Sequence, residues 1–406
     1  MRRIEKSEWD HALEAADPDR RRLCLFASRH ALQVDLLEIS GIHLAMAHVS
    51  AQRQIATASG SGFDAARAIM ACLGEAAEFA SWRWREEDSR RILAGSGPAP
   101  LTKIDARLNR IWSGWDRIPP AAMQDDPPER VCVRNFDGTA EASCPAFLVF
   151  GGFGARHGDA TLDADSNGCA AGPTLDAAKI SGLLELIERD ATGLWWHRGL
   201  IAPRYERNRI AAPVLRHAVE THRKETGRRL WFLDISPMRQ AAVIAAVSCR
   251  ADGARMMLGF GAALDIRSAA SSAFRELVQS ETALEAWEQR RSEGRPTTAE
   301  DCRIARWLRH SDVRRMRFVI GESADWPRSA ESRPDALLCA FRDIFGEPWF
   351  ADLTRPDIGV PVVKAVAEGL AHFKPRHGVR RLSESIWTDR ATRTPKALWS
   401  PLKLLV

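Results

Sequence analysis

The sequence predicts a mixed α/β (α+β) protein in which a strand, a glycine turn and a helix recur about three times. The strongest observation is a repeated signature: an alanine, a glutamate seven residues later, and a glutamate or glutamine three further on. Its copies are Ala68–Glu75–Glu78, Ala178–Glu185–Glu188 and Ala269–Glu276–Gln279. Positions three and seven apart share one face of a helix, so each copy presents its polar groups along one stripe.

Each copy follows a segment that contains glycine. The segments are Gly60-Ser61-Gly62, Ser166-Asn167-Gly168 and Gly259-Phe260-Gly261. An acidic residue lies shortly before each alanine, at Asp64, Asp176 and Asp265. If the three helices converge, up to five carboxylates meet at one place, and they repel one another unless metal ions or bound cations neutralise them.

A glycine turn that opens a helix also suits phosphate, because the first amides of the helix are unpaired. The chain has no GxxxxGK[ST] motif, and no GxGxxG opens a simple βαβ unit. A P-loop and a Rossmann site are therefore not supported. The glycine-rich segment 151–154 is predicted to be a tight turn and not a phosphate loop.

Hydrophobic patterns predict the elements in chain order. The charged residues 1–22 predict a helix or a loose arm, and the mixed, proline-containing residues 85–130 predict a surface excursion. The predicted strands are 23–27, 43–57, 131–133, 146–150, 229–235, 241–249, 255–261 and 358–366. The predicted helices are 65–84, 174–198 and 265–290. We divide the chain into an extension (1–49), a main domain (50–385) and a tail (386–406).

Composition limits the class of protein. The 406 residues are 45% hydrophobic and 27% charged, as in ordinary globular proteins, and the net charge is +5. This charge is spread along the chain and predicts no nucleic-acid partner. No signal peptide and no run of about 18 apolar residues occurs, which predicts no membrane partner. The eight cysteines lack zinc-site spacing, so we expect a reduced, cytoplasmic protein.

The second copy of the signature lies in an unusually apolar helix. A glutamate pair followed by an arginine is most often a solvated helix face. Here leucine, isoleucine, alanine and tryptophan surround Glu185 and Glu188, which predicts a buried helix. Buried carboxylates need partners, and Mg²⁺ bridged to nucleotide phosphates would supply them, with Arg189 clamping phosphate oxygens. The same argument applies with less force to Glu75 and Glu78.

Several reactive side chains receive a structural interpretation. We expect Cys72 and Cys169 to be small buried packing residues and not catalytic thiols. His197 is predicted to lie in the core or at its boundary and not to act as a general base. His372 and His377 flank a basic loop, for which solvent exposure and contact with an anionic substrate both remain open.

Taken together, the motifs resemble the YcaO family. Residues 166–196 resemble its central signature, and residues 60–78 resemble its upstream ATP/Mg²⁺ motif. Residues 259–279 resemble its downstream motif, and Gly-Val-Pro-Val-Val-Lys at 359–364 with Arg-Arg-Leu at 380–382 resembles a late segment. The resemblance covers roughly residues 50–385 and is strongest to the azoline-forming cyclodehydratases of thiazole/oxazole-modified peptides, a group that includes bacteriocins.

The resemblance implies ATP-dependent chemistry on a peptide backbone amide. It implies that Mg²⁺ is held by Glu75, Glu78, Glu185, Glu188 and Glu276. ATP would be bound by Ser61, Ser166, Asn167, Gly168, Arg189 and Gln279. The implied partners are a ribosomal precursor peptide, an E1-like or leader-peptide-binding protein and a flavin dehydrogenase. The implied assembly is a homodimer or a hetero-complex.

The chain departs from the family pattern at several positions. A lysine that many members have is Ser61 here, and a serine four residues before the first glutamate is Ala71. An asparagine and a glutamate of the second copy are Pro173 and Ala177. The C-terminal tail, which lies near the active site in azoline-forming members, keeps Pro401 but has Lys403 where a further proline is expected, and it ends at Val406.

These departures leave three functions open. The first is cyclodehydration of Cys, Ser or Thr to thiazoline or oxazoline. The second uses the same ATP chemistry with an external nucleophile, giving a thioamide or an amidine. The third is a catalytically degenerate scaffold subunit of a peptide-modifying complex.

Overall fold

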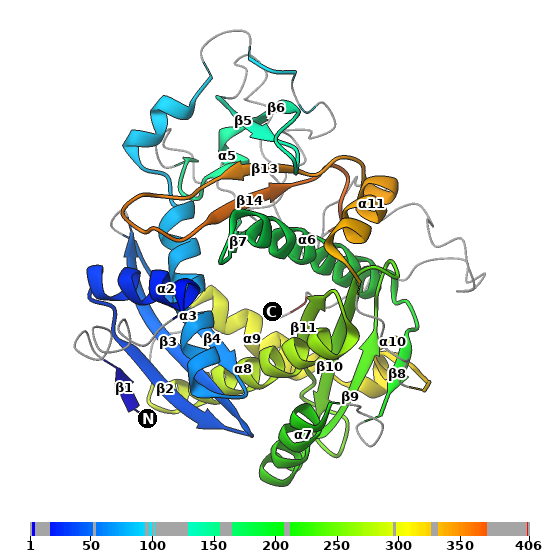
Figure 1. Ribbon diagram of the computed structural model, residues 1–406. Helices are drawn as coiled ribbons and strands as arrows, with labels where there is room; N and C mark the ends of the chain where they lie inside the picture. Colours follow the sequence, from blue (N-terminus) through cyan, green and yellow to red (C-terminus); the bar gives the residue numbers. More distant parts are fainter. Residues whose placement is uncertain are drawn as a thin grey trace.

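The computed structural model contains three β-sheets and three long helices, α3 (Ala65–Trp82), α6 (Leu175–Arg198) and α8 (Ile266–Ser292) (Figure 1). Each of these helices packs mainly against a different sheet. The structure describes residues 2–4, 17–51, 54–93, 97–99, 101, 129–154, 165–206, 212–294, 298–325, 332–371 and 404. The mixed α/β class predicted from the sequence is confirmed.

The first sheet is formed by the N-terminal part of the chain. Its antiparallel strands are, in order, β1 (Arg2–Ile4), β2 (Val34–Ile39), β3 (Ile42–Ala51) and β4 (Gln54–Gly62). Helix α3 packs against β3 and β4, and α2 (Pro18–Arg29) packs against α3. The predicted strand region 43–57 is confirmed as β3 and the first half of β4.

The strand predicted at 23–27 is wrong, because these residues lie inside helix α2. Cys24 and Ala27 are buried while the arginines one turn earlier are exposed, which is a helical pattern. The missed signal is Asp17-Pro18: the Asp17 carboxylate accepts the amide of Arg20 at 3.0 Å, and proline is favoured in the first turn of a helix.

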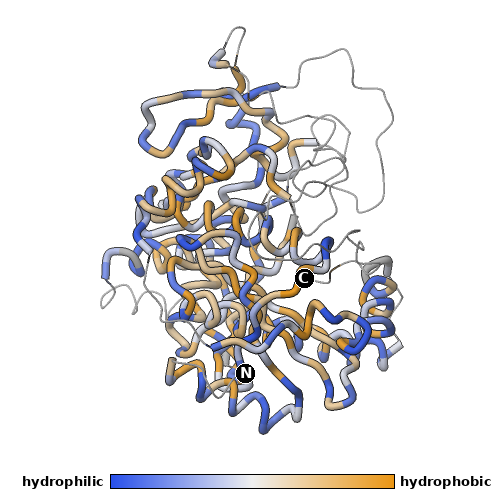
Figure 2. Tube along the Cα trace, turned by 90° about the vertical axis from the view of Figure 1, so that its right-hand side faces the viewer, coloured by the Kyte–Doolittle hydropathy of each residue, from blue (hydrophilic) through white to orange (hydrophobic). Residues whose placement is uncertain are grey.

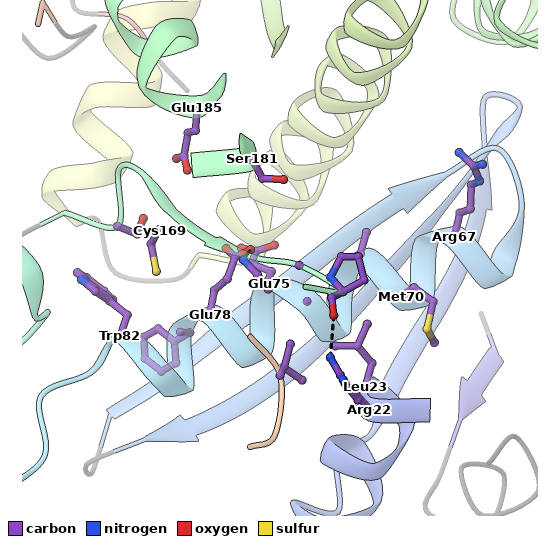
Figure 3. A pocket seen from close by; sticks show the side chains of 18 of the residues that line it. Arg22, Leu23, Arg67, Met70, Glu75, Glu78, Trp82, Cys169, Ser181 and Glu185 are labelled. Atoms are coloured by element: carbon purple, nitrogen blue, oxygen red, sulfur yellow. Dashed lines mark hydrogen bonds between the residues drawn. The ribbon is translucent and has the colours of Figure 1, made fainter. Parts of the chain in front are cut away.

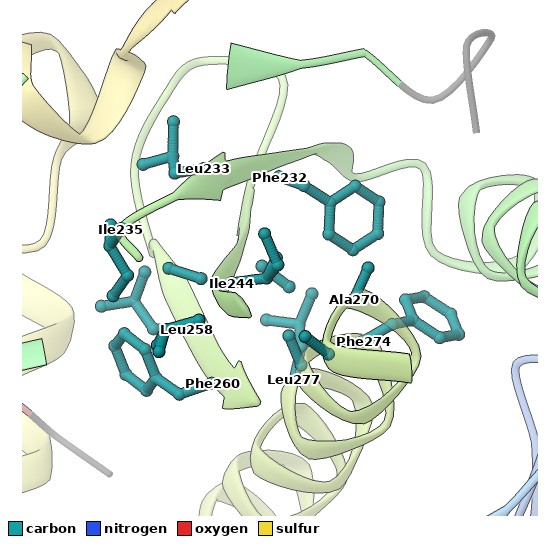
Figure 4. Close-up of a cluster of buried hydrophobic side chains, with 14 of the residues drawn as sticks. Phe232, Leu233, Ile235, Ile244, Leu258, Phe260, Ala270, Phe274 and Leu277 are labelled. Carbon is teal, nitrogen blue, oxygen red and sulfur yellow. The ribbon is translucent and has the colours of Figure 1, made fainter. Parts of the chain in front are cut away.

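The second sheet contains the largest hydrophobic core. Its strand order is β11-β10-β9-β8-β12, with β8 (Pro203–Tyr205), β9 (Arg229–Asp234), β10 (Ala242–Cys249), β11 (Met257–Ala263) and β12 (Glu322–Ser323). Helix α8 packs against β10 and β11. In Figure 4, Phe274 and Leu277 of α8 face Phe232 and Ile244 of the sheet. The three strands predicted in this region are confirmed.

The third sheet joins distant parts of the chain. Its strand order is β6-β5-β13-β14-β7, with β5 (Arg130–Arg134), β6 (Glu141–Pro145), β7 (Cys169–Ala171), β13 (Trp349–Asp352) and β14 (Val362–Val366). The strand predicted at 146–150 is wrong, because it is a short helix, α5 (Ala146–Val149). Residues 146–149 are all buried, and a short apolar run does not distinguish a strand from a buried helix.

Shorter elements complete the described chain. They are η1 (Glu86–Arg91), α7 (Pro213–Thr226), α9 (Ala299–His310), η4 (Val313–Arg315), α10 (Arg317–Ile320) and α11 (Pro334–Phe345). Figure 2 shows hydrophobic stretches concentrated in the interior of the molecule and hydrophilic ones at its periphery. Among the described helices, none combines the length and the apolar character needed to span a membrane.

Each long helix follows a strand at the edge of its sheet, which confirms the predicted repetition. The edge strands are β4, β7 and β11. The N-caps of the helices are Asp64, Thr174 and Asp265, and each side chain accepts a backbone amide from the first turn. The alanine of the signature comes four residues after each N-cap. The equivalence of Asp176 with Asp64 and Asp265 is therefore wrong, because Asp176 lies in the first turn of α6.

Glycine lets each helix backbone approach its strand. A Cβ at Gly60 would lie 2.4 Å from the carbonyl oxygen of Ala68, and one at Gly261 would lie 2.4 Å from that of Ala269. Both glycines stand four residues before an N-cap. Gly172 stands two residues before its N-cap, as Gly62 does in the first unit, and Cβ atoms at these glycines would lie 2.5 Å from the amide nitrogen of Ala178 and 2.6 Å from that of Ala68. Gly168 of the predicted turn is closely packed as well, because a Cβ there would lie 2.6 Å from the carbonyl oxygen of Ala365 and 3.0 Å from the side chain of Leu186 on α6.

Several predicted residues lie outside the described part of the chain. These are His372, His377, Pro401, Lys403 and Val406, together with most of 94–128 and of the tail. Leu404 is described, and it is buried in the core of the second sheet.

Candidate active site

A cavity of about 1020 Å³ lies between helices α2, α3, α6 and α8 and strand β7. Figure 3 shows Glu75 and Glu78 on α3 and Glu185 on α6 pointing into the same region. Arg189 on α6 and Ser166 also line the cavity. The structure therefore brings residues of the first two signature copies to one place, as predicted.

The carboxylates of α3 accept backbone amides of edge strands. Glu75 accepts the amide of Ser59 at 2.9 Å, and Glu78 accepts that of Ala171 at 2.7 Å. Burial raises the pKa of Glu78 to about 8, and the charges of Glu185 and Glu75 add to this rise. The pKa of Glu75 is also raised by the surrounding protein, although its side chain remains accessible from the cavity.

The carboxylates of α6 share one arginine. Arg189 lies 3.6 Å from an oxygen of Glu185 and 3.5 Å from one of Glu188. Burial raises the pKa of Glu185 to about 7, with Arg189 opposing the rise and Glu188 adding to it. Burial also raises the pKa of Glu188, which accepts the amide of Ala262 on β11. As predicted, α6 is buried on nearly all sides, including Glu188 and His197.

The third copy lies next to this arginine but does not line the cavity. Glu276 on α8 accepts the amide of Phe260 at 3.1 Å. Its pKa is raised to about 8 by burial and then by Glu188, while Arg189 lowers it. The Gln279 side-chain amide donates to the hydroxyl of Ser59 at 2.6 Å, so it supports the strand that holds Glu75.

These contacts close a ring through the three units. The second polar group of each signature copy reaches the edge strand of the following unit: Glu78 to β7, Glu188 to β11, and Gln279 to β4. An edge strand has unpaired amides that need acceptors. Four glutamates supply such acceptors: Glu75, Glu78, Glu188 and Glu276. The ring also brings each of the five signature glutamates close enough to interact electrostatically with at least one other.

The predicted turn at 166–168 packs against β14. Gly168 has φ +79°, and its carbonyl accepts the amide of Ala365 at 2.7 Å. The buried ammonium of Lys364 donates to the carbonyls of Asp165 and Asn167, both at 2.6 Å. Ser166 reaches the cavity, whereas Asn167 and Gly168 do not line it. Lys364 ends the segment 359–364 that carries part of the family resemblance, but the sequence alone did not assign it a role at the site.

Ser61 is also outside the cavity lining. Its carbonyl accepts a hydrogen bond from Arg275 on α8 at 2.8 Å. Arg275 and Arg67 do line the cavity and were not predicted from the sequence. Neither belongs to a signature position, so only the fold reveals them.

The cysteines near the site are structural. Both Cys72 and Cys169 are buried, as predicted. Burial raises the pKa of Cys72 to about 12 and that of Cys169 well above its usual range, so both remain neutral thiols. All eight cysteines lie in described segments and are free.

The acidic cluster fits Mg²⁺ that binds together with phosphate. Within the described residues, no three His, Cys, Asp or Glu side chains are close enough to hold a metal ion unaided. Mg²⁺ commonly takes one or two protein carboxylates and completes its shell with water and phosphate oxygens. Glu75, Glu78 and Glu185 offer such oxygens around a cavity that accommodates a large ligand.

The chain is similar to known proteins across most of its length. A model of the YcaO cyclodehydratase family, described as ATP- and Mg²⁺-binding, matches residues 59–371. An uncharacterized protein of Methanothermobacter thermautotrophicus is 28% identical over 287 residues, which cover 64% of this chain and 70% of that protein.

Solved structures show the same fold. A heterocyclase in complex with substrate and cofactor matches with a TM-score of 0.69 at 21% identity, covering 88% of this chain and 53% of that chain. YcaO from Methanopyrus kandleri bound with AMPPCP and Mg²⁺ matches with 0.65 at 21% identity, covering 91% and 92%. The Escherichia coli microcin synthetase McbBCD complex with pro-MccB17 bound matches with 0.60 at 14% identity, covering 83% and 88%. This chain therefore spans about half of the heterocyclase.

Proposed function

The chain belongs to the YcaO family, whose cofactors are ATP and Mg²⁺, and on this premise we propose that it activates backbone amides of a ribosomal precursor peptide. The reaction we propose is cyclodehydration of Cys, Ser or Thr to thiazoline or oxazoline. The observation that carries this proposal is the cavity where carboxylates of α3 and α6 meet Arg189.

The residues of this cavity have the chemistry that phosphoryl transfer needs. Glu75, Glu78 and Glu185 would hold Mg²⁺, and Glu188 and Glu276 would orient Arg189 toward phosphate oxygens. Burial disfavours the charge of Arg189, but Glu188 and Glu185 outweigh it and raise the pKa of the guanidinium, which stays charged. Catalysis of this kind depends mainly on positioning and charge neutralisation.

The thiol or hydroxyl of the peptide side chain loses its proton and attacks the preceding carbonyl carbon, so that a C–S or C–O bond forms and the carbonyl oxygen becomes anionic. ATP bound with Mg²⁺ would supply the γ-phosphoryl group that makes this oxygen a leaving group, and the bond to its terminal phosphorus breaks so that ADP departs. The amide nitrogen then loses its proton, the original C–O bond breaks with release of phosphate, and a C=N bond closes the ring.

The proposed partners are proteins that deliver or finish the peptide. The McbBCD complex holds its pro-peptide in an assembly of several proteins, which supports a hetero-complex here. We expect an E1-like or leader-peptide-binding protein, and a flavin dehydrogenase where azolines are oxidised. A cytoplasmic location would suit these partners and the eight free cysteines.

A second candidate, a scaffold subunit without catalysis, is favoured by one observation. Ala71 and Pro173 line the cavity without polar side chains, at positions where many family members carry polar groups. Titration calorimetry distinguishes the two. An active enzyme binds Mg-ATP, and we expect the Glu185→Gln variant to lose this binding. The Glu285→Gln variant should keep it, because Glu285 is an exposed residue on α8, outside the cavity.

The reaction is tested by intact-mass measurement of a precursor peptide incubated with the chain, a leader-binding partner and Mg-ATP. Each ring lowers the peptide mass by one water. A sulfide-dependent exchange of oxygen for sulfur would instead assign a thioamide-forming enzyme. Unchanged masses for several precursors, with Mg-ATP bound, would refute peptide amide activation.

A further inference from the structure

The cavity has a basic end as well as an acidic one. Arg22 on α2, Arg67 on α3 and Arg275 on α8 line it, so three helices each contribute a guanidinium. Arg67 and Glu78 are eleven residues apart on α3, or about 16 Å along the helix axis. Figure 3 shows Arg67 and Glu78 toward opposite ends of this helix. Met70 lies between them in the lining, and no ion pair joins the two ends among the described residues.

Arg275 is held in a fixed orientation by neutral oxygens. It donates to the carbonyl of Ser61 at 2.8 Å, to the hydroxyl of Ser272 at 3.0 Å and to the carbonyl of Ser271 at 3.2 Å. Its guanidinium carbon also lies 5.9 Å from the ring centre of Phe63. The described residues give it no carboxylate partner, and a partly buried cation is stabilised by a counter-charge.

Arg67 increases the need for a counter-charge. Burial lowers the pKa of Arg275, the charge of Arg67 lowers it further, and the carboxylate of Asp64 opposes this only in part, so the two guanidiniums repel each other. The ion pair of Arg67 with Asp64 is long, at 3.9 Å, and exposed, so it offsets little of this charge. Arg22 also lines the cavity, where it donates to the carbonyl of Pro173 at 2.7 Å.

We propose that Arg67 and Arg275 form an anion subsite for a phosphate group at the end of the cavity away from Glu78. This inference deepens the proposed function and rests on it, since it assigns a second contact for a phosphate-bearing ligand. Two guanidiniums match the charge and the several oxygens of a phosphate better than they match a single carboxylate, which would leave positive charge in excess. The phosphate belongs either to the nucleotide or to the inorganic phosphate released in the reaction.

The two ends of the cavity differ in their need for metal, which makes the subsite testable. At the acidic end Arg189 is paired with Glu185 and Glu188, so phosphate binds there mainly through a cation that neutralises the carboxylates, whereas Arg67 and Arg275 bind phosphate directly. Binding of tripolyphosphate and of inorganic phosphate is therefore measured by calorimetry with EDTA present. We expect Arg67→Gln and Arg275→Gln each to weaken this metal-free binding roughly 10- to 100-fold. Binding of tripolyphosphate alone would assign the nucleotide as the source, and binding of both probes would assign released phosphate as well.

Two further variants separate a loss of phosphate binding from a loss of folding or of net positive charge. Arg67 is exposed, so its replacement preserves the fold, and Arg275→Lys keeps the charge while losing the forked geometry, so it should bind with intermediate affinity. Arg20→Gln is the matched control, since Arg20 lines the cavity but is paired with Asp17 at 3.4 Å. Equal metal-free affinity in the wild type and an Arg67→Gln/Arg275→Gln double variant would overturn the proposal. Failure of the proposed function appears separately, as absent Mg-ATP binding or peptide modification.

Discussion

Replacing Gly60 or Gly261 by alanine tests the strand–helix packing of the repeated units. The added Cβ would lie 2.1 Å from the amide nitrogen of Cys72 in one case and 2.4 Å from the carbonyl oxygen of Ala269 in the other. Both neighbours are helix backbone atoms, which cannot rotate away. Overpacking a core costs about 1 to 3 kcal/mol, and a smaller unfolded-state entropy gain of roughly 0.4 to 1 kcal/mol offsets part of it. We therefore expect each variant to lose about 1 to 2 kcal/mol of unfolding free energy.

Gly74→Ala is the matched control on the same helix as Cys72. Gly74 is helical, and a Cβ there meets no heavy atom within 4 Å, so alanine should add about 1 kcal/mol of stability. The assay is urea unfolding followed by tryptophan fluorescence, with the midpoint and the slope compared between variants. Losses below about 0.5 kcal/mol at both Gly60 and Gly261 would refute the proposed equivalence of the two units.

Two further predictions concern charged groups. Without Mg²⁺, unfolding free energy should fall as the pH rises from about 4.5 to about 8, because Glu78 and Glu185 have raised pKa values and keep their protons longer in the folded state. The fall is on the order of 1 kcal/mol per pH unit for each group, measured by urea unfolding at several pH values, and a rise over this range would contradict it. Arg355→Met should cost about 3 to 5 kcal/mol, because it leaves Asp88 buried without the 2.8 Å partner that joins η1 to the loop after β13. An Arg355→Met/Asp88→Leu double variant should recover most of the lost unfolding free energy. If it recovers none, the loss comes from packing and not from the unpaired charge of Asp88.

The long helices could be predicted because their signals are local. Each has an N-cap, an apolar stripe and a repeated spacing within about 25 residues. The strand pairing of the third sheet could not be predicted from the sequence. Strand β5 pairs with its neighbour β6 but also with β13, which lies more than 200 residues further along the chain. Short strands such as β7 and β8 also carry too few residues for an alternation pattern.

The residues of the candidate site also fall into a part that local spacing predicts and a part that it does not. Helical spacing alone places Glu75 with Glu78, and Glu185 with Glu188, on shared stripes, so the acidic end was predictable. Arg275 could not be predicted as part of it, because its guanidinium reaches the first unit from α8, at Ser61. Contacts between units depend on how the sheets are placed, and this information is not contained in any one segment.

The ring of contacts explains why carboxylates persist in such a buried place. Each unit ends its sheet with an edge strand, and the amides of that edge need acceptors once the helices cover them. A glutamate of the preceding unit accepts such an amide with one carboxylate oxygen, as Glu78 accepts the amide of Ala171. The geometry that satisfies the amides therefore also brings the acids together and raises their pKa values, which favours a cation that neutralises them. The fold and the proposed cation site thus depend on the same side chains: a glutamine would keep the acceptor oxygen and lose the charge, and a leucine would lose both.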